Sequence, residues 1–308
     1  MTEEARGTRL AGGAGETNLG FLRFAGFRYW TASVLPALVG TTLPFWLRPP
    51  GFSFRWLGAI EFVIATVLFY AGFSFLQVQF EARSTADWPG SRLLKTASVC
   101  IVAGCLLGLH LDSGLNLHKG VPGYIFIVYG LSALFVGVLY VAPPFRFCRR
   151  VGREVVLSVS LGLMPVLGAY LIQVGDLTRK VYLASLPLVI ATALWVWTGE
   201  HVTKMDDEKA GRGTMVILFG PRFSGRFVVL VLSILMYATL FLAVFTASIS
   251  SVALVAVLSS GLVWRVVAIS WKEYDSPTRM LEARRNAFIL HLVTCVIVAA
   301  SSLAALGR

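Results

Sequence analysis

The stretch RFVVLVLSILMYATLFLAVFTASISSVALVAVLSSGLVWRVVAI, residues 226–269, contains only two charged residues, Arg226 and Arg265. Its apolar residues form continuous runs, whereas the strands of a membrane barrel would alternate apolar and polar positions. An α-helix needs about 20 predominantly apolar residues to cross the hydrocarbon core of a bilayer. The stretch is therefore long enough for two membrane-spanning helices, which we expect to be separated at the small residues Ser248–Ser251.

The rest of the chain repeats this pattern. Of its 308 residues, 56% are hydrophobic and only 14% are charged, whereas soluble proteins carry about 25% charged residues. The predicted spans are residues 27–47, 56–80, 94–111, 122–141, 154–175, 181–203, 226–247, 249–269 and 286–305. These runs predict an all-α polytopic membrane protein with nine transmembrane helices. Residues 21–308 would form a single transmembrane domain, and residues 1–20 a disordered cytoplasmic tail without the apolar core of a signal peptide.

The net charge of +11 follows from the predicted topology. When the N-terminus and every second loop are assigned to one side of the membrane, 21 of the 27 Lys and Arg residues fall on that side. Because Lys and Arg are enriched in cytoplasmic loops, we expect a cytoplasmic N-terminus, a C-terminus on the opposite side and a location in the cell membrane. The same bias accounts for the basic charge without a nucleic-acid partner.

Two polar clusters follow predicted helices on this cytoplasmic side. The first is QVQFEARSTAD, residues 77–87, in which Gln77 and Glu81 share one helical face. The second is EHVTKMDDE, residues 200–208, in which positions 200, 203, 204 and 207 share a face. Together the clusters supply candidate oxygen ligands for a metal: Gln77, Glu81, Glu200, Asp206 and Asp207.

These clusters have the composition of a magnesium–diphosphate site. Mg²⁺ takes one or two protein carboxylates and completes its shell with water and phosphate oxygens, and basic side chains would hold the remaining phosphate charge. The candidate diphosphate-binding residues are Arg83, Arg146, Lys204, Lys209 and Arg212. The alternative is that they are ordinary charges at the membrane interface, and spacing alone leaves both interpretations open. We expect the four cysteines to be small core residues and not metal ligands.

At these clusters the sequence resembles the UbiA superfamily of intramembrane prenyltransferases, closest to the menaquinone-pathway branch that acts on 1,4-dihydroxy-2-naphthoate. That superfamily has nine helices and aspartate-rich motifs after the second and sixth. The similar stretches are RFAGFRYWTASVLPALVGT at 23–41, FEARSTAD at 80–87, YVAPPFR at 140–146 with Gly152 and Glu154, MPVLGAYLIQVG at 164–175, and Asp207, Gly211, Arg212, Thr214 and Gly220.

Both motifs depart from the family pattern. Where the first motif reads Asn-Asp-x-x-Asp, this chain has Gln77, Val78 and Glu81. In the second, Gly199 and Thr203 replace the family's Asn and first Asp. The remaining oxygen donors would suffice for one Mg²⁺ bridged to diphosphate.

The resemblance implies transfer of an isoprenoid chain from a prenyl diphosphate to a small-molecule acceptor, with Mg²⁺-assisted release of diphosphate, and it favours an aromatic acceptor. Glu81, Asp87 and Asp207 would be the catalytic residues. Aromatic rings attract cations, so aromatic residues would line the site for the prenyl chain or acceptor: Tyr70, Tyr140, Tyr170 and Trp197. Two alternatives remain open: a terpene cyclase on the same fold, and a non-catalytic isoprenoid-binding or scaffold protein whose metal motifs have decayed.

Overall fold

The computed structural model describes residues 27–81, 90–119 and 124–304. Within those ranges the regular structure is entirely helical. The predicted all-α fold is therefore confirmed. The predicted N-terminal tail, Arg83 and Asp87 lie outside the described residues.

Each of the nine predicted spans corresponds to a helical segment. Six spans are single helices: α3 (Phe27–Leu47), α4 (Trp56–Phe80), α5 (Gly90–Lys119), α6 (Tyr124–Val141), α9 (Arg179–Lys209) and α14 (Pro277–Leu303). Two spans contain a π-helix: α7 (Arg153–Ser158) continues through η2 (Val159–Leu163) into α8 (Met164–Val174), and α11 (Pro221–Phe223) continues through η3 (Ser224–Val228) into α12 (Val229–Phe245). In the remaining span the 3₁₀ helix η4 (Ser251–Ser259) continues into α13 (Ser260–Lys272). Two short elements, the 3₁₀ helix η1 (Phe147–Arg149) and α10 (Met215–Phe219), lie in loops.

Most of these segments are long and apolar enough to cross a bilayer. Eight of those in the described ranges reach at least 18 residues with high mean hydropathy, and Ile125–Val141 in α6 is a shorter apolar helix. The predicted count of nine is thus approximate. The predicted break between two spans at Ser248–Ser251 is confirmed, because α12 ends at Phe245 and η4 begins at Ser251.

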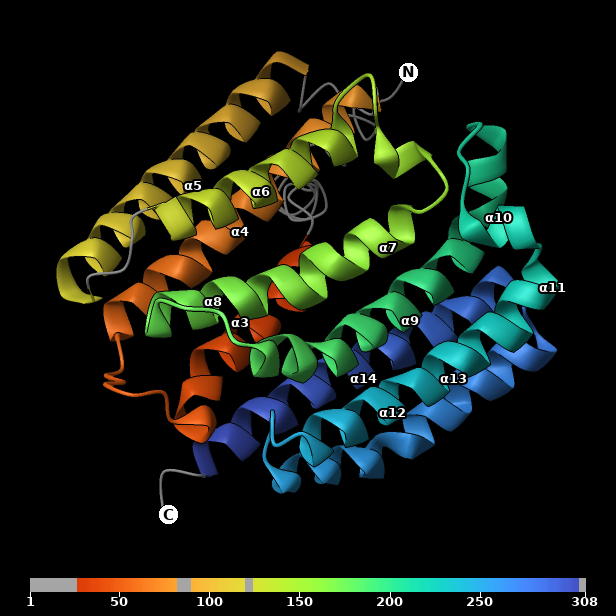
Figure 1. Cartoon of the computed structure of the whole chain (residues 1–308). Coiled ribbons are helices and arrows are strands. Elements are labelled where there is room, and N and C mark those ends of the chain that lie inside the picture. Colours follow the sequence, from red (N-terminus) through yellow and green to blue (C-terminus); the bar gives the residue numbers. More distant parts are fainter. Residues whose placement is uncertain (1–26, 82–89, 120–123, 305–308) are drawn as a thin grey trace, which may run out of the picture.

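The helices pack as a bundle of elongated rods (Figure 1). α4 packs against α5, α3 packs against α8 and α14, and α9 packs against α12 and α14. Buried apolar side chains from α3, α8, α9, α12 and α14 form the largest core cluster. Helix α9 therefore runs through the packed part of the bundle, and it carries the second acidic cluster at its C-terminal end.

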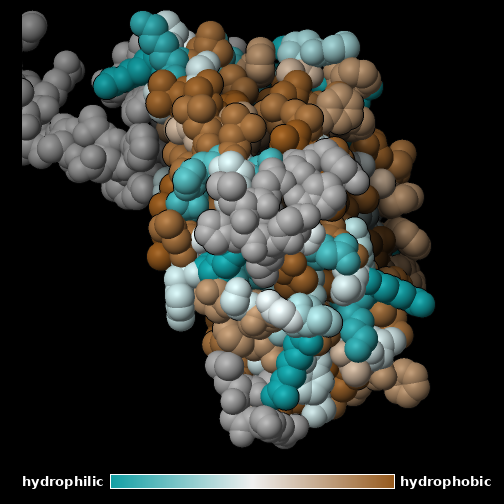
Figure 2. All heavy atoms as spheres, turned by 60° about the vertical axis from the view of Figure 1, so that its left-hand side comes forward, coloured by the Kyte–Doolittle hydropathy of each residue, from teal (hydrophilic) through white to brown (hydrophobic). Residues whose placement is uncertain are grey.

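The outer surface is rich in apolar side chains. Val99, Leu106, Phe135 and Trp264 are each more than half exposed, and Figure 2 shows broad areas of hydrophobic residues on one face. Monomeric soluble proteins rarely expose contiguous apolar surface on this scale. Together with the length of the helices, this surface identifies the chain as a multi-pass membrane protein.

Gly40 marks a close approach between α3 and α8. A Cβ atom at this position would lie 2.1 Å from the carbonyl oxygen of Val166, whereas one at Gly130 in α6 would meet no atom within 4 Å. We expect Gly40→Ala to lower the free energy of unfolding by about 1–3 kcal/mol through overpacking. Gly130→Ala should not lower it, because Ala has the higher helix propensity. Thermal unfolding in detergent measures both, and equal melting temperatures for the two variants would contradict this packing.

Candidate functional site

An apolar cavity of about 350 Å³ lies between α4, α5, α6 and the α7–α8 segment. Helix α4 lines it with one stripe of side chains, which includes Phe62, Thr66, Phe69, Phe73 and Gln77. Their spacing of three and four residues places them on a single face. At 1.5 Å per residue the stripe is about 22 Å long, so the cavity is an elongated apolar chamber.

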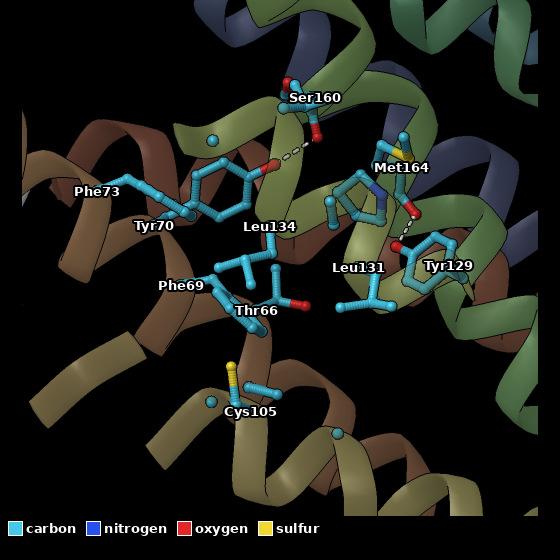
Figure 3. A pocket seen from close by; sticks show the side chains of 18 of the residues that line it. Thr66, Phe69, Tyr70, Phe73, Cys105, Tyr129, Leu131, Leu134, Ser160 and Met164 are labelled. Carbon is cyan, nitrogen blue, oxygen red and sulfur yellow. Dashed lines mark hydrogen bonds between the residues drawn. The ribbon is translucent and has the colours of Figure 1, made fainter. Parts of the chain in front are cut away.

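Tyr70 of α4 and Tyr129 of α6 line this cavity and donate hydrogen bonds to the backbone of the α7–α8 segment (Figure 3). The Tyr70 hydroxyl donates to the carbonyl of Ser160, and the Tyr129 hydroxyl donates to that of Met164 at 2.6 Å. Both carbonyls lie in or beside the π-helix η2, where the regular α-helical hydrogen-bonding pattern is interrupted. The rings are thereby held in place while their faces remain in an apolar environment.

The cavity has a polar end. Gln77 and Tyr140 line it there, and Gln77 Nε2 donates to Glu81 Oε1 at 3.1 Å. Glu81 is the C-cap residue of α4. The apolar chamber therefore leads to the first acidic cluster.

Arg212 joins the two acidic clusters. Its Nη1 donates to Asp207 Oδ1 at 3.0 Å, and its Nη2 lies 3.9 Å from Glu81 Oε2. The side chains of Glu81 and Asp207 are almost completely buried. The ends of α4 and α9, which are far apart in sequence, thus meet at one charged site.

Arg153, at the start of α7, forms the other half of this charged site. Its Nε and Nη2 donate to the two carboxylate oxygens of Glu200 at 2.8 and 2.5 Å. Nη2 also donates to Asp207 Oδ2 at 2.8 Å, and Thr203 Oγ1 donates to the same oxygen at 2.8 Å. One buried guanidinium group therefore bridges Glu200 and Asp207, the two buried acids of the second cluster.

The loop between α6 and α7 brings further positive charge to the site. Arg146 adopts a left-handed backbone conformation, with φ of 46°, and its guanidinium lies 5.8 Å from the centroid of the Phe80 ring. Burial raises the pKa of the neighbouring Cys148 thiol, and the negative charge of Glu81 raises it further, while Arg149, Arg153 and Arg146 oppose this shift. The electrostatic influence of Glu81 thus extends to this loop.

Glu154 anchors the loops around the site. Its side chain is buried, and its Oε1 accepts a hydrogen bond from the backbone N–H of Met215 at 2.7 Å. Its Oε2 accepts one from the N–H of Gly152 at 3.2 Å. Gly152 has a φ of 96°, a conformation that favours glycine. Glu154 therefore ties the start of α7 to the segment that follows Arg212.

The structure assembles some of the predicted site residues and not others. Glu81, Glu200, Asp207, Arg212 and Gln77 meet at the charged end, and Tyr70 and Tyr140 line the cavity.

Other predicted residues lie elsewhere. Asp206 and Lys209 are exposed, and Lys204 pairs with Glu208 at 3.9 Å. Tyr170 and Trp197 do not line this cavity, because they are packed in the two largest core clusters.

Glu81 and the Glu200–Asp207 pair differ in how well they fit a metal ion. In the described part of the chain no three His, Cys, Asp or Glu side chains converge on a common point. The Glu200–Asp207 side does not fit a metal, because guanidinium and hydroxyl donors occupy its carboxylate oxygens. Glu81 fits one Mg²⁺ better, since that ion needs only one or two protein carboxylates when phosphate oxygens supply the rest.

Three residues of this site were absent from the predicted set: Arg153, Thr203 as a hydrogen-bond donor, and Tyr129. The sequence feature that could have pointed to Arg153 is the concentration of four arginines between residues 146 and 153. Nothing in the sequence identified which of them would reach the second cluster.

Comparison with known proteins identifies relatives of this chain. It is 30% identical over 127 residues to the UbiA prenyltransferase domain-containing protein 1 of Gallus gallus, covering 39% of this chain and 34% of that protein. The Homo sapiens protein of the same name is 30% identical over 132 residues, covering 41% and 34%. The chain thus matches about a third of the length of these curated relatives.

Solved structures share the fold over almost the whole chain. A UbiA homologue from Archaeoglobus fulgidus superposes with a TM-score of 0.66 at 16% identity, over 94% of this chain and 99% of that one. The same homologue bound to GPP and Mg²⁺ gives a TM-score of 0.57, over 91% and 99%, also at 16% identity. The sequence profile of the UbiA prenyltransferase family matches residues 33–292, and the chain therefore belongs to that family.

Proposed function

We propose that this chain is a membrane-embedded prenyltransferase, which transfers an isoprenoid chain from a prenyl diphosphate to a small acceptor. The observation that carries the proposal is the continuity between the apolar cavity and the charged site through Gln77 and Glu81. A prenyl diphosphate has the same two parts, an apolar chain and a charged head. Structures of the Archaeoglobus fulgidus homologue bound to GPP and Mg²⁺ and to DMAPP and Mg²⁺ support the assignment.

In the proposed reaction the allylic C–O bond breaks and its electron pair leaves with diphosphate. A carbon of the acceptor then bonds to the allylic carbon and loses a proton. Arg212 would stabilise charge on the leaving group, together with Arg83 and Arg146. Glu81, together with Asp87 in the proposal, would hold one Mg²⁺, which when bound neutralises phosphate charge. Asp207 would act by holding Arg212 in place beside the leaving group.

The cavity would supply the remaining requirements of the reaction. Its apolar walls would exclude water from the allylic cation, and the faces of Tyr70 and Tyr140 would attract positive charge. The resemblance to the menaquinone-pathway branch supports an aromatic acceptor similar to dihydroxynaphthoate. The bias of Lys and Arg supports a cell-membrane location with the charged site on the cytoplasmic side.

The first prediction concerns the acids of the charged site. Glu81→Ala and Asp207→Ala should each lower diphosphate release from a prenyl diphosphate by about a hundredfold or more. The first removes the carboxylate proposed for Mg²⁺, and the second removes the acid that holds Arg212. Asp176→Ala is the control, since Asp176 is an exposed acid beyond the opposite end of the α7–α8 segment. A coupled phosphate assay with protein in detergent, Mg²⁺ and an aromatic acceptor measures the three variants against the parent.

The same assay separates the alternatives. A parent protein that releases no diphosphate from any common prenyl diphosphate would rule out the proposed reaction. A hydrocarbon or terpene alcohol formed without acceptor would instead identify a cyclase. Loss of Mg²⁺-dependent diphosphate binding, with the fold intact, would favour a non-catalytic isoprenoid-binding protein.

The second prediction concerns the cavity as the site of the prenyl chain. Thr66 is buried and lines the cavity about midway along α4, so Thr66→Phe should shorten the space available. We expect the catalytic efficiency with long prenyl diphosphates to fall by at least about tenfold, and that with the shortest donor to change much less. Val99→Phe on the exposed face of α5 is the control. An equal loss with every chain length would place the prenyl chain elsewhere.

A further inference from the structure

We propose that Arg153 is a permanent cation of the second acidic cluster, and that Glu200 and Asp207 consequently bind its guanidinium group instead of a divalent metal ion. The inference deepens the proposed function, because it limits any metal at the diphosphate site to the side of Glu81.

The first support is the geometry of the guanidinium. Three nitrogen atoms of Arg153 are engaged: Nε and Nη2 with Glu200, Nη2 also with Asp207, and Nη1 with the carbonyl oxygen of Cys148 at 3.2 Å. The Arg153 side chain is only 11% exposed, and those of Glu200 and Asp207 are 5% and 1% exposed. A planar group with paired donors thus occupies the space between the two acids, where an ion bridging them would have to lie.

The second support is the state of the carboxylate oxygens. Each of the four oxygens of Glu200 and Asp207 accepts a hydrogen bond from Arg153, Arg212 or Thr203. Mg²⁺ requires oxygen ligands at about 2.0–2.1 Å in near-ideal octahedral geometry. A Mg²⁺ ion that bridged Glu200 and Asp207 would therefore have to displace the Arg153 guanidinium from between them, which would leave a buried charge without its partner.

The third support is the chemistry of position 203. The resemblance to the UbiA superfamily places an aspartate here, but this chain has Thr203, whose hydroxyl donates to Asp207. The neighbouring Asp206 is exposed and does not replace the missing acid. By that resemblance position 203 lacks a carboxylate, and a buried arginine accompanies the two buried acids, Glu200 and Asp207.

The arginines nearest to Glu200 and Asp207 agree with this assignment. Glu200 and Asp207 carry two negative charges, and Arg153 and Arg212 carry two positive charges within hydrogen-bond distance of them. A divalent ion added between these acids would meet two fixed positive charges. At Glu81 the contacts differ in kind: its Oε1 accepts a hydrogen bond from Gln77 Nε2 at 3.1 Å, and its Oε2 lies 3.9 Å from Arg212 Nη2.

Mn²⁺ binding tests the inference by a readout independent of turnover. The full chain in phospholipid nanodiscs would be titrated with Mn²⁺ in the presence of inorganic pyrophosphate, and free Mn²⁺ would be counted by electron paramagnetic resonance. We expect no more than one Mn²⁺ per chain. Two ions per chain would overturn the inference.

Two matched substitutions locate an ion if one binds. Glu200→Gln should leave the Mn²⁺ affinity within about twofold of the parent while lowering the melting temperature, because it weakens only the pair with Arg153. Glu81→Gln should lower the affinity by about tenfold or more. The reverse pattern would place the ion at the second cluster and overturn the inference.

The remaining outcomes are also decisive. If Glu200→Gln does not fold, Glu81→Gln alone decides, because retained Mn²⁺ binding would place the ion at Glu200 and Asp207. If the parent binds no Mn²⁺, the inference about Arg153 holds and the proposed role of Mg²⁺ at Glu81 fails. Failure of the prenyltransferase proposal is distinguished by the diphosphate-release assay, which these binding measurements do not use.

Discussion

A chain of alternating charges, Glu81, Arg212, Asp207, Arg153 and Glu200, connects α4, the segment after α9, α9 itself and α7. A buried charge without a partner costs several kcal/mol, so each member of the chain constrains the position of the next. These pairs hold together the ends of helices that are distant in sequence. The polar end of the cavity forms where they meet.

The cavity depends on a second constraint, which is the need to satisfy backbone carbonyls away from water. Between α7 and α8 the π-helix interrupts the regular ladder, and the hydroxyls of Tyr70 and Tyr129 donate to carbonyls there. In an apolar environment an unsatisfied carbonyl would cost several kcal/mol. The same hydrogen bonds that stabilise this irregular segment therefore orient two aromatic rings along the cavity.

The resemblance and the structure both bring attention to the ends of α4 and α9, but the resemblance implies metal ligands there and the structure shows acids paired with arginines. The order of the motifs placed two acidic clusters at the ends of the second and sixth spans, and the structure brings the ends of α4 and α9 together. At the second cluster, however, Thr203 and Arg153 act as donors to Asp207. The fold thus agrees with the family, and in this chain Asp207 accepts hydrogen bonds from two arginines and a threonine.

The sequence by itself determined the helical membrane fold, because long apolar runs in a bilayer have few other ways to satisfy their backbone. Helical periodicity also predicted that Gln77 and Glu81 would be neighbours, as they are. It did not determine which arginine would reach each acid, since Arg153 and Arg212 lie at helix ends and loops whose positions depend on packing. Nor did it separate Tyr70, which lines the cavity, from Tyr170, which is packed in the core. In a membrane helix that is apolar on every side, no polar face indicates which residues turn inward, so only the tertiary structure decided the walls of the cavity and the pairing of its charges.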